Sequence, residues 1–426
     1  MSLMLFGVLI LLIAVGTPIA LALSGATLVT LVCTTDVTPI VVTQRFFTAV
    51  DSFSLMAIPF FMLAGLLMEK GGISKRLINL ANLLLGNMHG GLAIVTIIVS
   101  TFFGALTGSS AATVAAIGGI LVPAMIKSGY DEGFSLAVSA SSGYLGCIIP
   151  PSIPMITYGV ATGASIGAMF MAGVVPGILL ALGMCLYAFW LGRKNGYKAS
   201  NQKASPGEVW KAFREAAWAL LMPVIILGGI YGGIFTPTEA SCVALFYGLI
   251  ISIFVFKELS IRDLPGMIKQ AMVNSAMVMF IIAGAAAFGY LMTRGMIPAR
   301  IASTITGLTS NSIVFLLIVN VVLLVMGTFM ETNAAIMITA PIFLPIVNAM
   351  GINVVHFGII MIVNLAIGQI TPPLGVNLFV AAGIHGGKIE KVVNSHLIRL
   401  LLISILLLLV ITYIPGFSLA LPSLLK

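Results

Sequence analysis

Apolar runs follow one another along the whole chain, and only short polar segments separate them. Apolar residues make up 60% of the 426 positions and charged residues 8%, whereas a soluble domain carries about a quarter charged residues. One crossing of a bilayer takes roughly 20 residues. The pattern therefore predicts an all-α polytopic membrane protein with about ten to twelve spans, half-spans included.

Two of the apolar runs are interrupted by nearly the same short sequence, 222 positions apart (368 − 146 = 222). Residues 146–151 are GCIIPP, and residues 368–373 are GQITPP. A Pro-Pro pair does not fit inside a regular helix, because both residues lack an N–H and their rings clash with the preceding turn. Two broken helices at corresponding positions are typical of a transporter that is built from repeats and binds its substrate at the breaks.

Other segments match between the two halves in the same order. The pairs are residues 17–18 with 236–237, residues 65–73 with 289–297, and Gly104 and Ala111-Ala112 with Gly327 and Ala334-Ala335. This order predicts a duplication, with a first repeat at 1–215 and a second at 216–426 that meet at the polar linker 192–215. We expect the repeats to be inverted in the membrane, and a scaffold domain and a transport domain to interleave elements of both.

Each repeat also contains two short apolar segments joined by a polar turn. The arms are residues 92–105 and 113–125 around the turn 107–110, and residues 313–329 and 334–347 around the turn 330–333. The arms of the first repeat, of about 14 residues or fewer, are too short to cross a bilayer at 1.5 Å per residue. We therefore predict re-entrant hairpins at about 92–125 and 313–347, each followed by a broken helix near 146–151 or 368–373.

The net charge of +8 comes from basic residues in the connections between apolar runs. Six of them crowd the linker region: Arg193, Lys194, Lys198, Lys203, Lys211 and Arg214. The positive-inside rule places this linker in the cytoplasm. Membrane topology therefore explains the basic residues, and nucleic-acid binding is dismissed. Residues 208–214 alternate apolar and charged positions, which predicts a helix along the membrane surface with Trp210 and Phe213 turned inward.

The hairpin turns and the breaks supply the candidate ligands. An interrupted helix leaves carbonyls and N–H groups free; carbonyl and hydroxyl oxygens bind a hard cation such as sodium, and helix N-termini attract anions. We predict one sodium site at Gly108, Ser109, Ser110, Thr113, Gly146, Ile149 and Pro150, and another at Glu331, Thr332, Asn333, Gly368, Gln369 and Thr371. The predicted substrate-binding residues are Ser110, Ser152, Asn333, Pro372 and Asn377. Against this reading, Ser, Thr and Gly are also ordinary packing residues between membrane helices.

Glu331 stands out because a carboxylate inside an apolar stretch is costly and is a functional hypothesis by default. It has three candidate roles: ligand of a cation, carrier of a proton, or cap of the following helix through the N–H groups of Asn333 and Ala334. Glu239 follows Thr236-Pro237 in the pattern of a helix N-terminus, which favours a capping role there.

Most enzyme chemistry has no motif in this chain. The chain contains no GxxxxGK[ST] phosphate-binding loop and no HExxH zinc motif, so neither ATP hydrolysis nor a metal centre other than sodium is expected. The turn Gly108-Ser109-Ser110 lacks a full GxSxG elbow, which leaves an intramembrane serine hydrolase as a remote alternative. A non-transporting assembly scaffold is a further alternative class.

The hairpin GALTGSSAAT at 104–113, the segment IPPSI at 149–153 and the segment QITPPLGVN at 369–377 resemble the large membrane (M) subunit of TRAP transporters, the tripartite ATP-independent periplasmic transporters. The resemblance extends over nearly the whole chain. It implies two inverted repeats and sodium-driven import of an organic acid anion, such as a C4-dicarboxylate or a sialic acid, by an elevator motion in a bacterial inner membrane. The chain is then a transport subunit and not an enzyme.

The same resemblance implies two protein partners, a small four-helix membrane subunit and a periplasmic substrate-binding protein. Because the repeat starts directly at the beginning of this sequence, we expect the small subunit to be a separate chain. Related transporters outside the family carry Ser-Asn-Thr at both hairpin tips, where this chain has Gly108-Ser109-Ser110 and Glu331-Thr332-Asn333. Backbone carbonyls are therefore expected to supply more of the sodium ligands here. The alternative is a stand-alone ion-coupled anion carrier that needs no binding protein.

Overall fold

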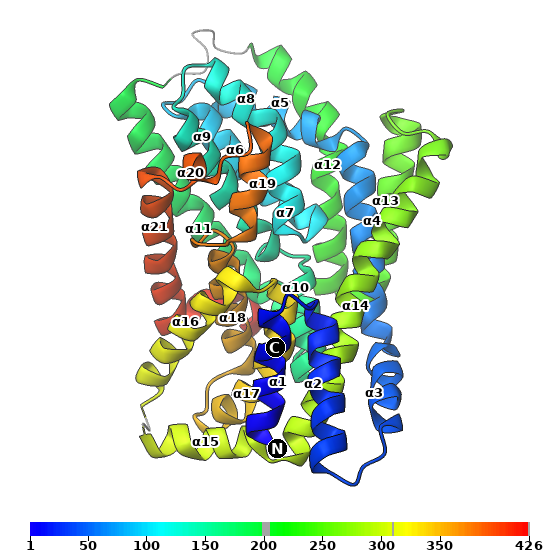
Figure 1. The fold of residues 1–426 in the computed structure, drawn as a ribbon. Helices are drawn as coiled ribbons and strands as arrows, with labels where there is room; N and C mark the ends of the chain where they lie inside the picture. The colour runs from blue at the N-terminus through cyan, green and yellow to red at the C-terminus, as the bar shows by residue number, and fades with distance from the viewer. Residues whose placement is uncertain (198–204, 309–310, 425–426) are drawn as a thin grey trace.

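The computed structural model describes residues 1–197, 205–308 and 311–424, and within these ranges every regular element is helical. Lys198 and Lys203 of the basic linker lie outside the described residues. Figure 1 shows a bundle of steeply inclined helices, with one helix, α15, lying across its lower end.

Elements of the first half follow the predicted order. They are α1 (Ser2–Ala14), α2 (Ile19–Thr34), α3 (Ile40–Val50), η1 (Phe53–Met56), α4 (Ala57–Lys70), α5 (Ile73–Leu85), α6 (Gly91–Thr107), α7 (Ser110–Thr113), the π-helical turn η2 (Val114–Gly118), α8 (Gly119–Lys127), α9 (Glu132–Gly143), η3 (Tyr144–Cys147), α10 (Ile153–Thr162) and α11 (Ile166–Asn195).

The second half repeats much of this order. Its elements are α12 (Pro206–Tyr231), α13 (Pro237–Ile250), η4 (Ile251–Val255), η5 (Ile261–Asp263), α14 (Leu264–Arg294), α15 (Ile297–Leu308), α16 (Ser312–Phe329), α17 (Thr332–Ala349), α18 (Val354–Gly368), α19 (Val376–Ile384), α20 (Ile389–Val392), α21 (Ser395–Tyr413) and α22 (Gly416–Ser423).

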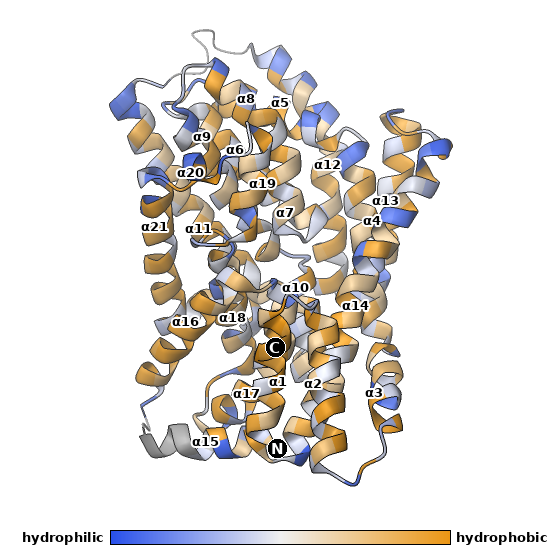
Figure 2. Cartoon of the chain, viewed as in Figure 1, coloured by the Kyte–Doolittle hydropathy of each residue, from blue (hydrophilic) through white to orange (hydrophobic). Residues whose placement is uncertain are grey.

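The apolar surface forms a broad band between two polar ends. In the described ranges, nine helices are long and apolar enough to cross a membrane, and six shorter apolar helices accompany them. Figure 2 shows hydrophilic residues concentrated at the top and bottom of the bundle and orange, hydrophobic helices between them. This distribution is that of a multi-pass membrane protein.

The predicted surface helix at 208–214 is wrong. These residues form the first two turns of the 26-residue helix α12, which starts in a capping box between Ser205 and Glu208 and continues directly into an apolar run. Trp210 and Phe213 are 68% and 44% exposed on this helix. A good N-terminal cap at Ser205 favours one long helix that starts there, and Pro223 lies inside this helix without ending it.

The two hairpins approach the middle of the molecule from opposite ends. Figure 1 shows α6 and α8 in the upper part of the bundle and α16 and α17 in the lower part, with both turns near the centre. The arms are longer than predicted, at 17 residues for α6 and 18 for both α16 and α17. Helices α16 and α17 are long and apolar enough to span a membrane, and re-entrance of the hairpins stays a prediction.

In each half, the first arm of the hairpin crosses the broken helix at a pair of glycines. A Cβ atom added to Gly104 would lie 2.5 Å from the Cα of Gly146, and one added to Gly368 would lie 2.5 Å from the Cα of Gly327. The backbones touch at these points, which small residues alone permit. The two contacts hold each turn against the break of its own repeat.

We expect Gly104→Ala to lower the thermal unfolding midpoint of the purified protein. The added methyl group has no space at the crossing, and overpacking of this kind costs about 1–3 kcal/mol. Gly119→Ala is the matched control, because a Cβ atom there meets nothing within 4 Å and alanine is the better helix former. Equal midpoints for the two variants would contradict the close crossing.

Candidate binding site at the paired hairpin turns

The first turn brings three oxygen atoms together. Helix α6 ends at Gly108, whose φ of +60° suits glycine, and the chain then turns into α7. The Thr113 hydroxyl donates to the Ser109 carbonyl at 2.8 Å and lies 3.3 Å from the Thr107 hydroxyl. A Cβ atom on Gly146 would lie 2.8 Å from both the Ser109 carbonyl oxygen and the Thr113 hydroxyl. Glycine at this position therefore leaves the oxygen atoms facing the backbone of the first break.

At the second turn, Glu331 caps helix α17. Its Oε2 accepts from the N–H of Asn333 at 2.9 Å and from that of Ala334 at 3.2 Å, and its Oε1 accepts from the Asn333 side-chain amide at 2.7 Å. The capping role considered for Glu331 is confirmed; the structure leaves its other two candidate roles untested. Residue Glu331 is exposed, in contrast to buried Thr332 and Asn333.

The second turn is also bonded to the second break. The side-chain amide of Gln369 donates to the Thr332 hydroxyl at 2.6 Å, and the same nitrogen lies 3.9 Å from the Cys147 sulfur of the first break. Gln369 is 6% exposed. One side chain therefore links a turn, its own break and the break of the other repeat.

Each turn is bonded to the helix that follows the break of the other repeat. The Ser110 hydroxyl donates to Asn377 Oδ1 at 2.8 Å, at the start of α19. The Thr157 hydroxyl of α10 donates to Asn333 Oδ1 at 2.9 Å. Asn377 also donates to the Ala140 carbonyl of α9 at 3.1 Å. These crossed hydrogen bonds, Ser110–Asn377 and Thr157–Asn333, join the two repeats at one point.

The two breaks differ in their exposure. At the first, the Ser152 hydroxyl donates to the Cys147 carbonyl at 2.5 Å, and Pro150, Pro151 and Ser152 are buried. At the second, Pro373 and Leu374 are exposed. The second break is therefore the more exposed of the two.

The structure brings together some of the residues predicted for the first sodium site. Ser109, Thr113 and Gly146 meet as described, with Gly108 at the turn itself. Ile149 packs instead against Gly177 of α11. Among the described residues, no hydrogen bond to Pro150 is found. Ser110 is directed to Asn377, which was predicted as a substrate residue, so these two predicted substrate residues do lie together.

The structure brings together fewer of the residues predicted for the second sodium site. Thr332 and Gln369 are bonded to each other, and Asn333 is bonded to Glu331 and Thr157. Gly368 contacts Gly327, and the Thr371 hydroxyl, in the break, donates to the carbonyl of Ile367 near the end of α18 at 3.0 Å.

Of the other predicted substrate residues, Ser152 bonds to the first break, and Pro372 is half-buried at the second. The sequence prediction missed Thr157 and the Ala140 carbonyl. No local pattern marks either of them.

The chemistry of the site rests on hydroxyl, amide and carbonyl groups. Among the residues that the structure describes, no three His, Cys, Asp or Glu side chains are grouped to hold a metal ion. The Ser110 hydroxyl faces the amide of Asn377, and an amide does not act as the general base that a serine nucleophile requires. The arrangement favours binding of a hard cation over hydrolysis.

Helices α4 and α14 cover the two turns unequally. Gly65 of α4 packs on the first turn, where a Cβ atom would lie 3.0 Å from the Cα of Thr107. Gly289 of α14 corresponds to Gly65 in the repeat, but a Cβ atom there meets nothing within 4 Å. Phe329, beside the second turn, is 59% exposed. The first turn is therefore closed against α4, while the matching face of α14 is open.

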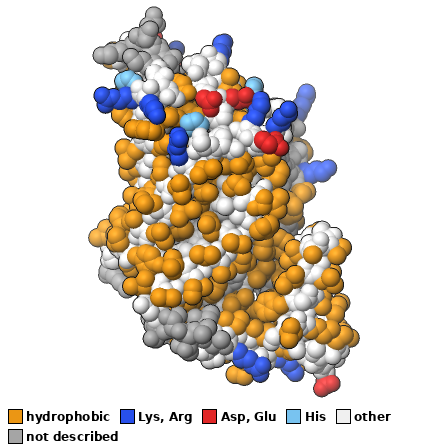
Figure 3. All heavy atoms as spheres, turned by 60° about the vertical axis from the view of Figure 1, so that its left-hand side comes forward, with side chains coloured by type: hydrophobic (Ala, Val, Ile, Leu, Met, Phe, Trp, Pro, Cys, Tyr) orange, Lys and Arg blue, Asp and Glu red, His pale blue; other side chains and the backbone are white. Residues whose placement is uncertain are grey.

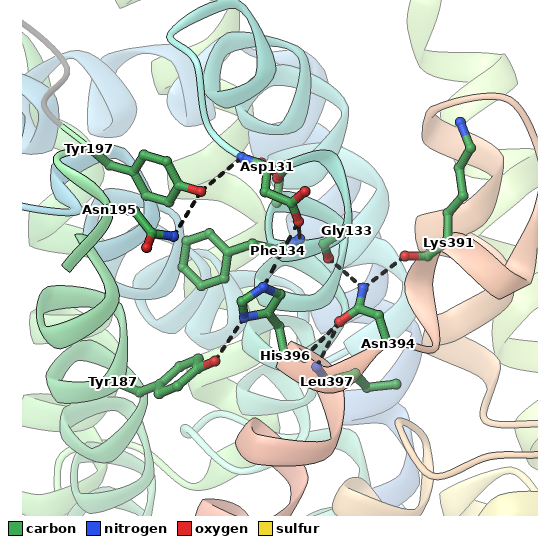
Figure 4. A network of polar contacts seen from close by, with 11 residues as sticks. Asp131, Gly133, Phe134, Tyr187, Asn195, Tyr197, Lys391, Asn394, His396 and Leu397 are labelled. Carbon is green, nitrogen blue, oxygen red and sulfur yellow. Dashed lines mark hydrogen bonds and ion pairs between the residues drawn. The ribbon is translucent and has the colours of Figure 1, made fainter. Parts of the chain in front are cut away.

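A polar network ties together the upper ends of α9, α11 and α21 (Figure 4). Asp131 caps α9 by accepting from the N–H of Phe134 at 2.8 Å. The Tyr187 hydroxyl of α11 lies 2.9 Å from His396 Nδ1 at the start of α21, and Asn394 donates to the Gly133 carbonyl at 2.9 Å. These contacts hold the three helices at fixed relative positions, as one unit around the breaks.

Comparison with known families gives a match over most of the chain. The family model described as "Tripartite ATP-independent periplasmic transporter, DctM component" matches residues 6–417. The C4-dicarboxylate TRAP transporter large permease protein of Rhodobacter capsulatus is 42% identical over 100% of this chain and 99% of its own length. The sialic acid TRAP transporter large permease protein of Vibrio cholerae is 35% identical over 96% and 95%, respectively.

Another relative is longer than this chain. The isethionate TRAP transporter permease protein DctMQ of Oleidesulfovibrio alaskensis is 48% identical over 97% of this chain, which spans 65% of that protein. Among solved structures, the YdaH transporter of Alcanivorax borkumensis has a TM-score of 0.61 with 18% identity, covering 90% of this chain and 86% of that one. At this identity the likeness concerns the fold alone.

We expect Glu331→Ala to lower the thermal unfolding midpoint by the equivalent of about 1 kcal/mol, because the cap of α17 is lost. Glu331→Asn should recover most of this stability, since asparagine is a good N-cap without the charge. Thermal unfolding of both variants in detergent measures the effect. If Asn proves as damaging as Ala, the negative charge of Glu331 contributes more to stability than its capping bonds.

Proposed function

Because the chain belongs to the family of DctM components of tripartite ATP-independent periplasmic transporters, we propose that it is the permease subunit through which sodium drives the import of an organic acid anion. The observation that carries the proposal is the crossed pairing of Ser110 with Asn377 and of Thr157 with Asn333. It supports a single binding site made from two turns and two breaks, as expected for a transporter of repeated architecture.

Sodium is assigned to the oxygen atoms around each turn. Near the first turn these are the Ser109 carbonyl and the Thr107 and Thr113 hydroxyls; near the second they are the Thr332 hydroxyl and the Glu331 carboxylate. Such neutral and anionic oxygens suit a hard cation. Each sodium ion that moves down the membrane potential supplies about 2.3 kcal/mol per 100 mV, which is enough to drive accumulation of the solute.

The substrate anion is assigned to the first turn and the start of α19. A helix N-terminus attracts anions through its free N–H groups, but Glu331 already occupies that of α17. The Ser110–Asn377 pair at the start of α19 lies beside the exposed second break and carries no negative charge. The names of the relatives support C4-dicarboxylates, sialic acids and isethionate as candidate substrates.

An elevator motion of the transport domain accounts for the unequal covering of the turns. In an inverted-repeat transporter, access alternates when one part moves against another around the bound solute. The contact of Gly65 with the first turn supports one end state. The open face of Gly289 on α14 then receives the second turn in the opposite state.

Two partners and a location complete the proposal. A periplasmic binding protein delivers the anion, a small membrane subunit braces the scaffold, and the assembly resides in a bacterial inner membrane with the basic linker in the cytoplasm. An apolar groove of about 480 Å³ between α3 and α14, lined by Phe46, Phe47 and Phe280 among others, is a suitable surface for the small subunit. A stand-alone carrier would instead take up solute without any soluble component.

We expect Thr113→Ala and Thr332→Ala, each of which removes a hydroxyl assigned to a sodium site, to raise the sodium concentration required for half-maximal uptake by about tenfold. A tenfold change corresponds to about 1.4 kcal/mol of binding. Uptake is measured in vesicles that contain the complete transporter and its binding protein. Thr339→Ala is the control, because the Thr339 hydroxyl bonds to Ala335 in its own helix. Unchanged sodium dependence in both turn variants would contradict the assignment.

We expect Gly289→Trp to abolish uptake and to leave the thermal unfolding midpoint near that of the unchanged protein. A Cβ atom at Gly289 meets nothing within 4 Å in the present state, and an indole there would occupy the face that the second turn must reach. Gly228→Trp on α12, also at an open position, serves as the control and should transport normally. Normal uptake by Gly289→Trp would exclude docking of the second turn on this face of α14.

A further inference from the structure

An apolar groove runs along the outside of the bundle between α5, α6 and α11. Its volume is about 490 Å³. It is lined by Leu85, Met88, Ile94, Ile98, Thr101, Phe102, Ile178, Ala181, Leu182, Cys185, Leu186 and Phe189. Only Thr101 and Cys185 interrupt an otherwise hydrocarbon and aromatic lining. The groove faces the bilayer, because Phe102, Leu182 and Leu186 are 44%, 56% and 69% exposed.

A basic side chain, that of Arg193, follows one end of this groove. The α11 residues that line it recur every three or four positions from Ile178 to Phe189, and residues at this spacing share a helix face. Arg193 is the next residue of that series, one turn beyond Phe189 toward the basic end of the chain, and it is exposed. Within the described ranges no hydrogen bond or ion pair is recorded for its guanidinium.

The neighbouring cation is placed differently. Lys194 lies on a different face of α11, and its ammonium stands 5.4 Å from the ring centre of Trp190. Figure 3, which shows one face of the molecule, has Lys and Arg side chains gathered along the upper rim above a wide hydrophobic band. Arg193 therefore combines a basic position at the rim with direct continuity to the groove.

The apolar lining of the groove and the charge beyond its end indicate its occupant. An acyl chain is thin and needs only an apolar lining. An arginine at the end of an apolar groove matches a phosphate, which accepts two parallel hydrogen bonds from guanidinium.

We infer that this groove binds one anionic phospholipid, with an acyl chain between α5, α6 and α11 and the phosphate at Arg193. The site is separate from the turns and breaks, and its occupation does not depend on the proposed transport function. It has a mechanical consequence, because α6 leads directly into the first turn and α5 contacts α12 and α4 of the scaffold. A bound chain fills the space between them on the bilayer side.

Native mass spectrometry of the delipidated full-length protein tests the inference with phosphatidylglycerol and phosphatidylcholine of the same chain length. We expect phosphatidylglycerol to bind at least about tenfold more tightly, and Arg193→Gln to remove this preference. Lys194→Gln is the matched control and should retain it. Leu182→Trp should abolish binding of the tight lipid by filling the groove, and Leu186→Trp provides a second variant if the first is not monodisperse.

Each contrary result overturns a stated part of the inference. Equal binding of the two lipids, or equal losses in Arg193→Gln and Lys194→Gln, would mean general attraction to a basic rim. Tight binding that survives both tryptophan variants would place the lipid outside the groove. Displacement of the lipid by the small membrane subunit in the assembled transporter would assign the groove to that protein.

Discussion

Free backbone groups inside a bilayer are the constraint on which this structure depends. Each broken helix and each hairpin turn exposes N–H and C=O groups where no water compensates them, so such backbone persists only where protein or a ligand satisfies it. Here the side chains of each turn and break satisfy backbone groups of the same segment: Thr113 donates to the Ser109 carbonyl, Ser152 to the Cys147 carbonyl, and Glu331 accepts from the N–H groups of Asn333 and Ala334. Gly104 and Gly327 let the hairpins approach the breaks, and hydroxyl and amide side chains complete the bonding. The polar groups that remain around the turns are those available to a cation and an anion.

The crossed hydrogen bonds give this arrangement a further property. If each turn were bonded only to its own repeat, the repeats would form two independent sites. Because Ser110 is bonded to Asn377 and Thr157 to Asn333, a ligand that orders one turn also orders the helix after the other break. Coupling between two ligands requires such a shared element, whose ordering both ligands favour.

The sequence was sufficient to predict the elements but not their partners. The Pro-Pro pairs interrupt helices through local geometry, which can be read within a few residues, and comparison of the two halves of the sequence located both turns. Ser110 and Asn377, by contrast, lie 267 positions apart, and nothing local marks Thr157 as the partner of Asn333. The surface helix expected at 208–214 was wrong because its amphipathic spacing was considered without the apolar run that follows it.

The two turns carry different charges at corresponding positions, because Glu331 stands where the first repeat has Gly108 (331 − 108 = 223). The first turn is uncharged and already lies against Gly65 of the scaffold. The second turn would have to take an exposed carboxylate against α14, and an unpaired charge is costly to remove from water. On the proposed mechanism, a sodium ion at the second turn neutralises Glu331 and lowers that cost. The carboxylate that caps α17 thereby makes closure of the second turn depend on the cation, which is the condition that coupled transport requires.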